Sequence, residues 1–344
     1  MSAFGESMAR LLRGEDLPRT DAERVMDECM GGALEAPQIA ALLTALAAKG
    51  VRSAELAGFA AAMRRAATPV RSGGGLVDTC GTGGSGLPTT NTSTVCAFVL
   101  AAAGVPVAKH GNRASSGRCG SMDVLEELGV AIEIGPDAAG SLLADQGLAF
   151  LFAPLYHPAM RHVAPVRRSL GFRTVFNFLG PLCNPAGARR QLLGVSDPSM
   201  APRMARALAG LGSERVLVVW GEDGLDELSL GAPTRTWELV DGELTEGRLT
   251  PEELGLEPAS FEALAGGDRA ENARHFLAIL AGEDRGPRAD HLALNAGAAL
   301  MVAGRARDIA AGIEQARELV ACGAVLERFE AYRAASRALS GDRK

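Results

Sequence analysis

The segment GLVDTCGTGGSGLPTTNTSTVCAFVLAAAG, residues 75–104, contains a strand-like run, a glycine-rich loop and a helix-like run in that order. Residues 75–80 have strand length, and residues 91–104 are apolar enough for a buried helix. A loop that follows a parallel strand lies at the carboxyl edge of the sheet, where ligands bind. The segment therefore predicts a βα unit that carries a binding loop.

The same alternation continues along the chain. Helix-sized segments lie between most of the further strand-length runs, which are residues 105–111, 130–135, 148–154, 190–196 and 215–221. This order predicts an α/β fold with a mainly parallel central sheet flanked by helices on both faces. Residues 234–249 predict a hairpin that turns at Asp241-Gly242. A helix is expected after Thr250 and Pro251, and the chain from about residue 271 is helical again.

Residues 1–70 predict helices only, as a small all-helical domain. Thr20 and Glu23 have the spacing of a capping box, Gly50 ends an apolar helix, and Pro69 stops the next. Residues 73–344 are expected to form a larger α/β domain. A helical segment around residues 160–190 lies between its strands, and it is expected to pack back on the first domain.

Charge, hydrophobicity and cysteine spacing argue against several classes of protein. The chain has 344 residues, 47% of them hydrophobic, and a formal net charge of −6, which argues against nucleic acid or an anionic membrane as a partner. No apolar run is long enough to span a bilayer. The six cysteines show no zinc-ligand spacing, and residues 1–16 do not resemble a secretory signal, so a cytoplasmic protein with reduced thiols is expected.

Two loops have the composition of a phosphate site. Glycines in the first loop let backbone N–H groups approach an anion, and Asn91, Ser93 and Thr94 stand near the start of the following helix. The second loop, residues 109–118, brings Lys109 and Arg113 to a neighbouring strand end. The pattern is neither a Walker A loop nor a dinucleotide fingerprint. Together the loops suit a ligand with several phosphates, although a flexible turn and a solvated charged loop remain the alternatives.

A third loop is acidic. Glu222, Asp223, Asp226 and Glu227 follow the strand at residues 215–221. A polyphosphate ligand usually brings Mg²⁺, which prefers hard oxygen ligands such as these. The alternative is an acidic turn that faces water.

Five motifs in succession resemble those of anthranilate phosphoribosyltransferase, namely GTGG-G…T-N-ST, KHGNR…SS, GS-DVLEELG, HPAM-HVAPVR-SLG-RT-FN-LGPL-NPA and G-DGLDELSL. The resemblance covers nearly the whole chain and implies a nucleoside phosphorylase/phosphoribosyltransferase-like fold. It also implies transfer of the 5-phosphoribosyl group of phosphoribosyl pyrophosphate (PRPP) to the amine of anthranilate, in tryptophan biosynthesis. Mg²⁺ as cofactor and a homodimer formed through the N-terminal helices follow from the same resemblance.

The resemblance also implies the roles of individual residues. Metal positions are Ser93, Asp226 and Glu227. Residues implied for anthranilate are Gly81, His110, Asn112, His157, Arg167 and Pro181. Residues implied for PRPP are Gly81, Gly84, Ser85, Thr89, Asn91, Ser93, Thr94, Lys109, Gly111, Asn112, Arg113, Ser115, Ser116, Gly117 and Ser121.

No residue is expected to act as a general acid or base. The amine of anthranilate is neutral near pH 7, so its lone pair is available without one. Lys109 is expected to act electrostatically on the negative charge of the leaving pyrophosphate. Arg167 is expected to hold the carboxylate of anthranilate.

The chain departs from the family pattern at several positions. Ser85 stands where Asp is common, Thr90 where Phe is usual and Thr92 where Ile is usual, while Cys119 and Met122 replace smaller residues. These departures leave open a paralogous phosphoribosyltransferase with another aromatic acceptor. A nucleoside phosphorylase on the same scaffold is also left open, as is a non-catalytic relative that binds nucleic acid.

Overall fold

The structure is a computed structural model, and it describes residues 2–87, 89–114 and 119–340. Within these ranges the strands form one seven-stranded sheet in the order β3-β2-β1-β4-β5-β6-β7. The first five strands in that order are parallel, and β6 and β7 add an antiparallel hairpin at one edge. Their bounds are Val77–Gly81 (β1), Val107–Gly111 (β2), Leu148–Phe152 (β3), Arg190–Gly194 (β4), Arg215–Gly221 (β5), Thr234–Val240 (β6) and Glu243–Leu249 (β7).

The strand order reverses beside β1. The chain runs from β1 outward to β2 and β3, and then returns to place β4 on the other side of β1. Gly81 and Gly194, the last residues of β1 and β4, pair directly in the register. Loops that leave such a reversal point diverge to opposite sides and open a crevice at the carboxyl edge, so the glycine-rich loop begins at the usual ligand position of an open α/β sheet.

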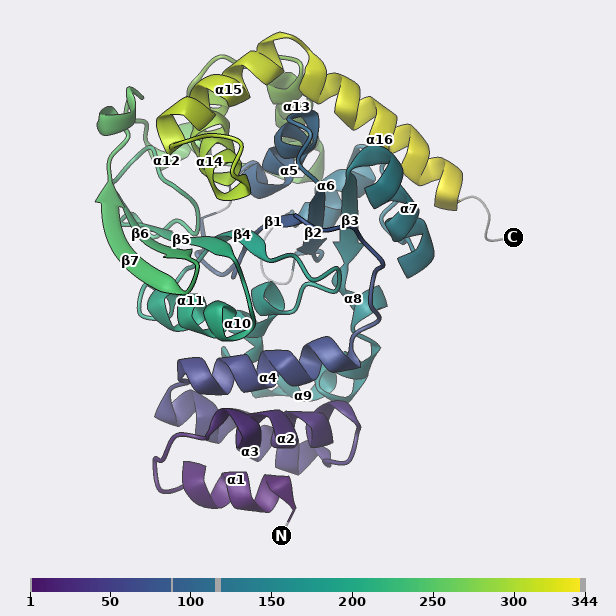
Figure 1. The fold of residues 1–344 in the computed structure, drawn as a ribbon, viewed down its shortest axis with the longest axis vertical. Helices are drawn as coiled ribbons and strands as arrows, with labels where there is room; N and C mark the ends of the chain where they lie inside the picture. Colours follow the sequence, from purple (N-terminus) through teal and green to yellow (C-terminus); the bar gives the residue numbers. More distant parts are fainter. Residues whose placement is uncertain (1, 88, 115–118, 341–344) are drawn as a thin grey trace.

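Helices cover both faces of the sheet, as the fold prediction expected (Figure 1). One face is covered by α5 (Thr92–Ala102), α14 (Pro287–Ala303) and α16 (Ala324–Ser340), with α6 (Ser121–Glu127), α7 (Pro136–Gln146), α12 (Phe261–Leu264), α13 (Arg269–Leu280) and α15 (Ile309–Ala321) around them. Phe98 of α5 packs against Phe150, Phe276 and Phe329 at the centre of this layer. The opposite face carries α10 (Phe176–Leu179) and α11 (Ala201–Gly210).

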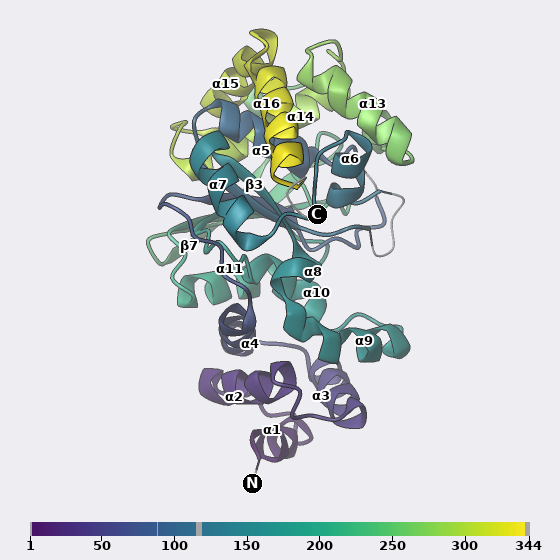
Figure 2. The same ribbon diagram turned by 90° about the vertical axis from the view of Figure 1, so that its right-hand side faces the viewer.

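Four N-terminal helices lie apart from the sheet, beyond α10 and α11 (Figure 1). They are α1 (Ala3–Leu11), α2 (Arg19–Met30), α3 (Ala36–Lys49) and α4 (Ser53–Ala66). A second, short-helix segment comprises α8 (Ala153–Tyr156), η1 (Pro158–His162), α9 (Ala164–Leu170) and η2 (Gly180–Leu182), and its α9 packs beside α3 (Figure 2). One apolar cluster runs from these helices through Val163 and Leu179 to Met204 of α11 and Val218 of β5.

Two local expectations were wrong. Residues 130–135 are not a strand, although Val130, Ile132 and Ile134 are buried. The segment bonds to α16 instead of to a strand, since the Ala131 N–H donates to the Ser336 hydroxyl at 3.2 Å. On the edge strand β3, the Phe150 N–H donates to the Tyr332 hydroxyl of the same helix at 3.1 Å. Thr20 is not an N-cap, since α2 begins one residue earlier, at Arg19 after Pro18, and its N-cap makes no side-chain hydrogen bond.

The helix expected after Thr250 and Pro251 is only a short 3₁₀ turn, η3 (Glu252–Leu254), whose N-cap is Pro251. Thr250 and Glu253 exchange hydrogen bonds of 3.4 and 2.8 Å across its start. The helical segment after His157 is broken into short pieces, because proline stands at the start of most of them. Among the described residues, no helix has the length and apolar character needed to cross a membrane.

Candidate active site

The glycine-rich loop leads from β1 into the start of α5. Asn91 caps this helix in the left-handed conformation, with φ of 58° and ψ of 42°. Its side chain donates to the Cys119 carbonyl at 3.2 Å and accepts from Asn272 of α13 at 3.0 Å. These bonds join the first loop to the end of the second loop, so the two candidate phosphate loops are neighbours in space.

Lys109 lies beneath the loops and is 2% exposed. Its ammonium group donates to the Thr79 carbonyl and, at 3.1 Å, to the Ser93 hydroxyl. Burial lowers the pKa of Lys109, and the nearby Asp78 carboxylate opposes that change. The positive charge therefore lies between the end of β1 and the first turn of α5, where it would stabilise a bound anion.

The acidic loop after β5 separates its four carboxylates. Glu222 is exposed to solvent and forms an ion pair with Arg248 at 2.9 Å. Asp223 accepts a hydrogen bond from the Ser229 hydroxyl at 2.5 Å. Asp226 accepts the Gly83 N–H at 3.0 Å, which brings the acidic loop onto the glycine-rich loop. Only Asp226 and Glu227 therefore face the candidate phosphate loops.

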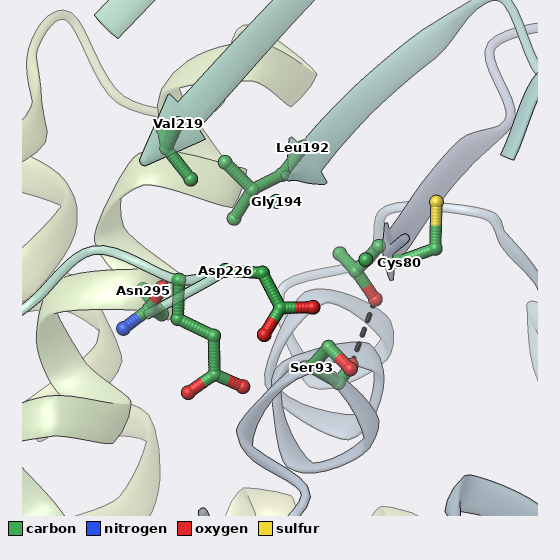
Figure 3. Close-up of a pocket in the computed structure, with 10 residues that line it drawn as sticks. Cys80, Ser93, Leu192, Gly194, Val219, Asp226 and Asn295 are labelled. Carbon is green, nitrogen blue, oxygen red and sulfur yellow. Dashed lines mark hydrogen bonds between the residues drawn. The ribbon is translucent and has the colours of Figure 1, made fainter. Parts of the chain in front are cut away.

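A cavity of about 70 Å³ lies where these segments meet (Figure 3). The ends of β1, β4 and β5 form one wall, and Ser93, Asp226, Glu227 and Asn295 form the rest. Figure 3 shows the Asp226 carboxylate directed toward the turn that carries Ser93. Glycine is required on the sheet side, because a Cβ at Gly81 would lie 2.7 Å from Asp226 Oδ2 and one at Gly194 would overlap the Asp226 carbonyl.

Glu227 is the most strongly perturbed carboxyl group of the cavity. Burial raises its pKa to about 8, and the neighbouring Asp226 carboxylate adds to that rise, whereas the hydroxyls of Thr89 and Thr92 and the Lys109 ammonium lower it. Its Oε2 atom is buried and accepts no hydrogen bond from the described residues. A bound cation would satisfy this oxygen and favour the ionised form.

The donor set fits a magnesium ion held with its substrate. Within the described ranges, no group of three or more His, Cys, Asp or Glu side chains is arranged to enclose a metal. Mg²⁺ commonly takes one or two carboxylates and completes its octahedron with waters and substrate phosphates. Asp226, Glu227 and the Ser93 hydroxyl supply that kind of partial oxygen set beside one cavity.

Three residues predicted for the aromatic acceptor come together around the end of β2. The His110 and His157 rings have centroids 5.0 Å apart, and His110 Nδ1 lies 3.3 Å from the carbonyl of Gly180, which precedes Pro181. Burial lowers the pKa of His110 to about 3 and also lowers that of His157. Both rings are therefore neutral, and neither Nε2 atom has a hydrogen-bond partner in the described part of the chain.

Arg167 lies on α9 and is half-buried, with its guanidinium 5.3 Å from the centre of the Phe176 ring. Burial lowers its pKa. No carboxylate among the described residues pairs with it, nor with its neighbours Arg161 and Arg168. A half-buried arginine without an acid is suited to bind a carboxylate from a ligand.

The second loop holds its predicted residues in different ways. The Asn112 carbonyl accepts the Ser121 hydroxyl at 3.2 Å, which closes the loop beside Gly111. Arg113 is already engaged, since it pairs with Glu126 at 2.7 Å and stacks 4.7 Å from the Phe152 ring. Ser115, Ser116 and Gly117 lie outside the described residues.

Several residues of this region were not singled out from the sequence. Asp78 is buried below Lys109, where burial raises its pKa to about 6 and Asn184 donates to it at 2.8 Å. Arg173 donates to the Gly83 carbonyl at 3.3 Å and to the Ser196 hydroxyl at 3.1 Å, so it holds the glycine-rich loop. His291 of α14 touches the acidic loop. Asp78 lies on β1, within the segment that carries the glycine-rich loop. Arg173 and His291 lie on segments that reach the loops only in three dimensions, although the motif around Arg173 was among those quoted for the family.

Comparisons with known proteins agree over the whole chain. The family described as "Glycosyl transferase family, a/b domain" matches residues 73–326, and "Glycosyl transferase family, helical bundle domain" matches residues 6–67. The chain is 49% identical to the anthranilate phosphoribosyltransferase of Rubrobacter xylanophilus over 98% of each protein. Its structure is similar to that of anthranilate phosphoribosyltransferase from Thermus thermophilus, with 48% identity and a TM-score of 0.92 over 98% of this chain and all of that one.

The enzyme from Saccharomyces cerevisiae is more distant in sequence. Its structure in complex with PRPP and Mg has 28% identity and a TM-score of 0.88, over 97% of this chain and 98% of that one. Its structure in complex with 4-fluoroanthranilate has 27% identity and a TM-score of 0.86, over 96% and 97% of the two chains.

Proposed function

The chain belongs to the anthranilate phosphoribosyltransferase family, and on that premise we propose that it transfers the 5-phosphoribosyl group of PRPP to the amine of anthranilate. The products are N-(5-phosphoribosyl)anthranilate and pyrophosphate, and the step belongs to tryptophan biosynthesis. The observation that carries the proposal is the cavity beside β1 and β4, where Ser93 and two carboxylates face two phosphate-type loops.

The proposed site divides into a phosphate side and an acceptor side. Loop amides and hydroxyls bind the 5-phosphate and the pyrophosphate of PRPP, and Lys109 donates a hydrogen bond to Ser93. Ser93, Asp226 and Glu227 would hold Mg²⁺, which supplies charge neutralisation of the pyrophosphate when it is bound. Glu227 accordingly works ionised, although burial alone favours its neutral form.

The acceptor side orients anthranilate. Arg167 receives its carboxylate, and the neutral pair His110 and His157 lines the space for the ring with Pro181. Because the aniline nitrogen already carries a free lone pair near pH 7, the work of these residues is orientation and exclusion of water. Asn112, at the end of β2, is assigned to both substrates.

A fluorescence assay tests the proposal. Protein is mixed with PRPP, Mg²⁺ and anthranilate, and the loss of anthranilate fluorescence is followed; we expect a decay that requires all three additions. The Asp226→Asn, Glu227→Gln double variant should lose the Mg²⁺-dependent turnover and keep the circular dichroism of the parent. A parent protein that leaves the fluorescence constant at high concentration contradicts the function, and a double variant with near-normal rates contradicts the metal assignment alone.

We also propose the setting in which the enzyme works. Residues 1–70 form one domain and residues 73–344 the other. The packing of α9 against α3 and of η1 against α2 supports the assignment of the segment around 160–190 to the first. A homodimer through the N-terminal helices is supported by Leu12, whose side chain is 77% exposed at the end of α1. Six free thiols support a reducing, cytoplasmic location. Sedimentation at several concentrations, with Leu12→Lys as the variant, tests the dimer.

A further inference from the structure

A buried histidine joins the two segments that carry the metal-site residues. The Nε2 atom of His291 lies 2.9 Å from the Leu228 carbonyl, and its Nδ1 atom lies 3.3 Å from the Thr92 hydroxyl. Because a carbonyl oxygen only accepts, Nε2 carries the proton, and Nδ1 therefore accepts from the Thr92 hydroxyl. His291 is 1% exposed, so both bonds are shielded from water.

The acidic loop is held from the same helix by a second side chain. Asn295 lies one turn after His291 on α14, and its amide binds both backbone groups of Leu228, accepting from the N–H and donating to the carbonyl at 3.0 Å each. Leu228 directly follows Glu227. Fixing its backbone therefore fixes the point from which the Glu227 side chain enters the cavity.

The other end of the link stands beside Ser93. Thr92 is the first residue of α5 and immediately precedes Ser93, so the imidazole of His291 spans from the helix that carries the metal-site hydroxyl to the loop that carries the metal-site carboxylates. A side chain without a hydroxyl at position 92 could not donate to Nδ1, so the hydrogen-bonded link depends on Thr92 itself.

We propose that His291 is a positioning residue that sets the separation between Ser93 and the Asp226–Glu227 pair, with Thr92 and Asn295 as its partners. This inference rests on the proposed function, since it concerns the same metal and PRPP site. It adds His291, whose Nε2 also lies 3.6 Å from Glu227 Oε2, and Asn295, which lines the cavity, as residues that hold the proposed ligands in place. His291 would act on the affinity for the divalent cation. Only a few protein oxygens would bind that cation, so a small change in the spacing of Ser93, Asp226 and Glu227 would weaken its binding.

Binding of Mn²⁺ in the presence of PRPP, followed by the paramagnetic resonance signal of the free ion, tests the role without turnover. His291→Leu removes both bonds and is expected to weaken Mn²⁺ binding about tenfold, and Thr92→Val removes one and should weaken it about threefold. His291→Gln keeps a donor and an acceptor and should stay within about twofold of the parent. Thr174→Val, another buried threonine isostere, is the matched control and should bind as the parent does.

A double-mutant cycle separates positioning from simple burial. The Thr92 hydroxyl also lies near Glu227, so its variant alone does not isolate the ring. If the two residues act as one link, Thr92→Val weakens metal binding less in the His291→Leu background than in the parent. In both single variants the Mg²⁺ concentration for half-maximal rate should rise more than the anthranilate KM.

Three results would overturn the inference: additive effects in the cycle, a His291→Gln variant as weak as His291→Leu, or unchanged Mn²⁺ affinity in Thr92→Val. If His291→Leu fails to fold, the glutamine and valine variants decide the matter by the same affinities. If the parent binds Mn²⁺ with PRPP and performs the transfer, and the variants behave as the parent does, only the role of His291 is contradicted. If the parent neither binds them nor performs the transfer, the proposed function itself is contradicted.

Discussion

At the scale of single residues, Arg167 is the cation best suited to a ligand carboxylate. It stacks near Phe176, burial lowers its pKa, and no acid among the described residues neutralises it. Arg167→Ala is expected to raise the anthranilate KM by tenfold or more, because a charged hydrogen bond is worth about 2 kcal/mol, and to change the PRPP KM little. Steady-state kinetics with each substrate varied in turn measures this.

The exposed neighbour Arg168 provides the control for that experiment. Arg168→Ala should leave both constants near those of the parent. If Arg167→Ala raised the KM values for anthranilate and PRPP equally, Arg167 would not be the residue that binds the anthranilate carboxylate.

Ser85 is the departure that most directly touches the phosphate loop. Its hydroxyl accepts the Leu87 N–H at 3.3 Å, and Arg173 binds the carbonyls of Gly83 and Gly84 beside it. Ser85→Asp adds a carboxylate to the loop whose Gly83 N–H bonds to Asp226, so we expect a lower Mg²⁺ concentration for half-maximal rate. Ser85→Asn has nearly the same shape without the charge and serves as the control. Coinciding Mg²⁺ titrations for the two variants would show that the carboxylate has no influence.

At the scale of elements, the helical domain is held by a buried carboxylate. Glu55 of α4 accepts the Leu17 N–H at 2.9 Å, the Arg52 N–H at 2.8 Å and the Lys49 ammonium at 3.0 Å. It thus fastens the loop before α2 and the end of α3 onto α4. The three acceptor bonds explain why a fully buried acid is tolerated among apolar helices.

Glu55→Ala should therefore lower the free energy of unfolding by about 3 kcal/mol, because it leaves the Leu17 and Arg52 N–H groups without this acceptor and removes the carboxylate that pairs with Lys49. Urea unfolding at neutral pH measures the change. Glu314→Ala, at an exposed position of α15, should stay within about 0.5 kcal/mol of the parent. A similar loss in both variants would contradict the role of Glu55.

The element that departs most from its expected form is the segment of residues 157–180. Its sequence is helical in composition, yet it folds as three short helices around Pro158, Pro165 and Gly171. This broken path is what brings Arg167 beside α3 on one side and Arg173 onto the glycine-rich loop on the other. A continuous helix could not present both side chains to those places.

At the scale of the whole molecule, the raised pKa of Glu227 makes the free energy of unfolding depend on pH. The folded protein keeps the Glu227 proton up to about pH 8, whereas the unfolded chain loses it near 4.5. The contribution of this group to stability is therefore present at low pH and is lost as pH rises through 8. Asp78 acts in the same direction, but its pKa of about 6 places its effect at lower pH.

With metal removed by a chelator, we expect the free energy of unfolding to fall between pH 7 and 8.5, by at most about 1.4 kcal/mol per pH unit. The buried histidines have lowered pKa values and titrate below this window. Glu227→Gln should flatten the decline, and Glu318→Gln, at an exposed position, should retain it. Urea unfolding of both variants between pH 7 and 8.5 measures the slope of stability against pH. A slope that persists in Glu227→Gln would show that another group than Glu227 releases the proton.

The sequence by itself determined the fold class, because strand-helix alternation, glycine at strand ends and the Asp241-Gly242 turn are local signals with local causes. The five successive motifs likewise identified the family, which the comparisons bear out. The assignment of site residues by those motifs stays a prediction. Local patterns failed at residues 130–135, where alternation of apolar residues reflects burial under α16 instead of sheet pairing.

The tertiary structure alone decided that Asp226 and Glu227 line the cavity, whereas Glu222 and Asp223 bind Arg248 and Ser229 outside it. It also decided that Thr92 meets His291, 199 positions away, and that Gly194 makes room for the Asp226 backbone. The physical reason is the same in each case: a hydrogen bond or a close approach between distant segments depends on the packing of helices on the sheet, which no spacing along the chain encodes.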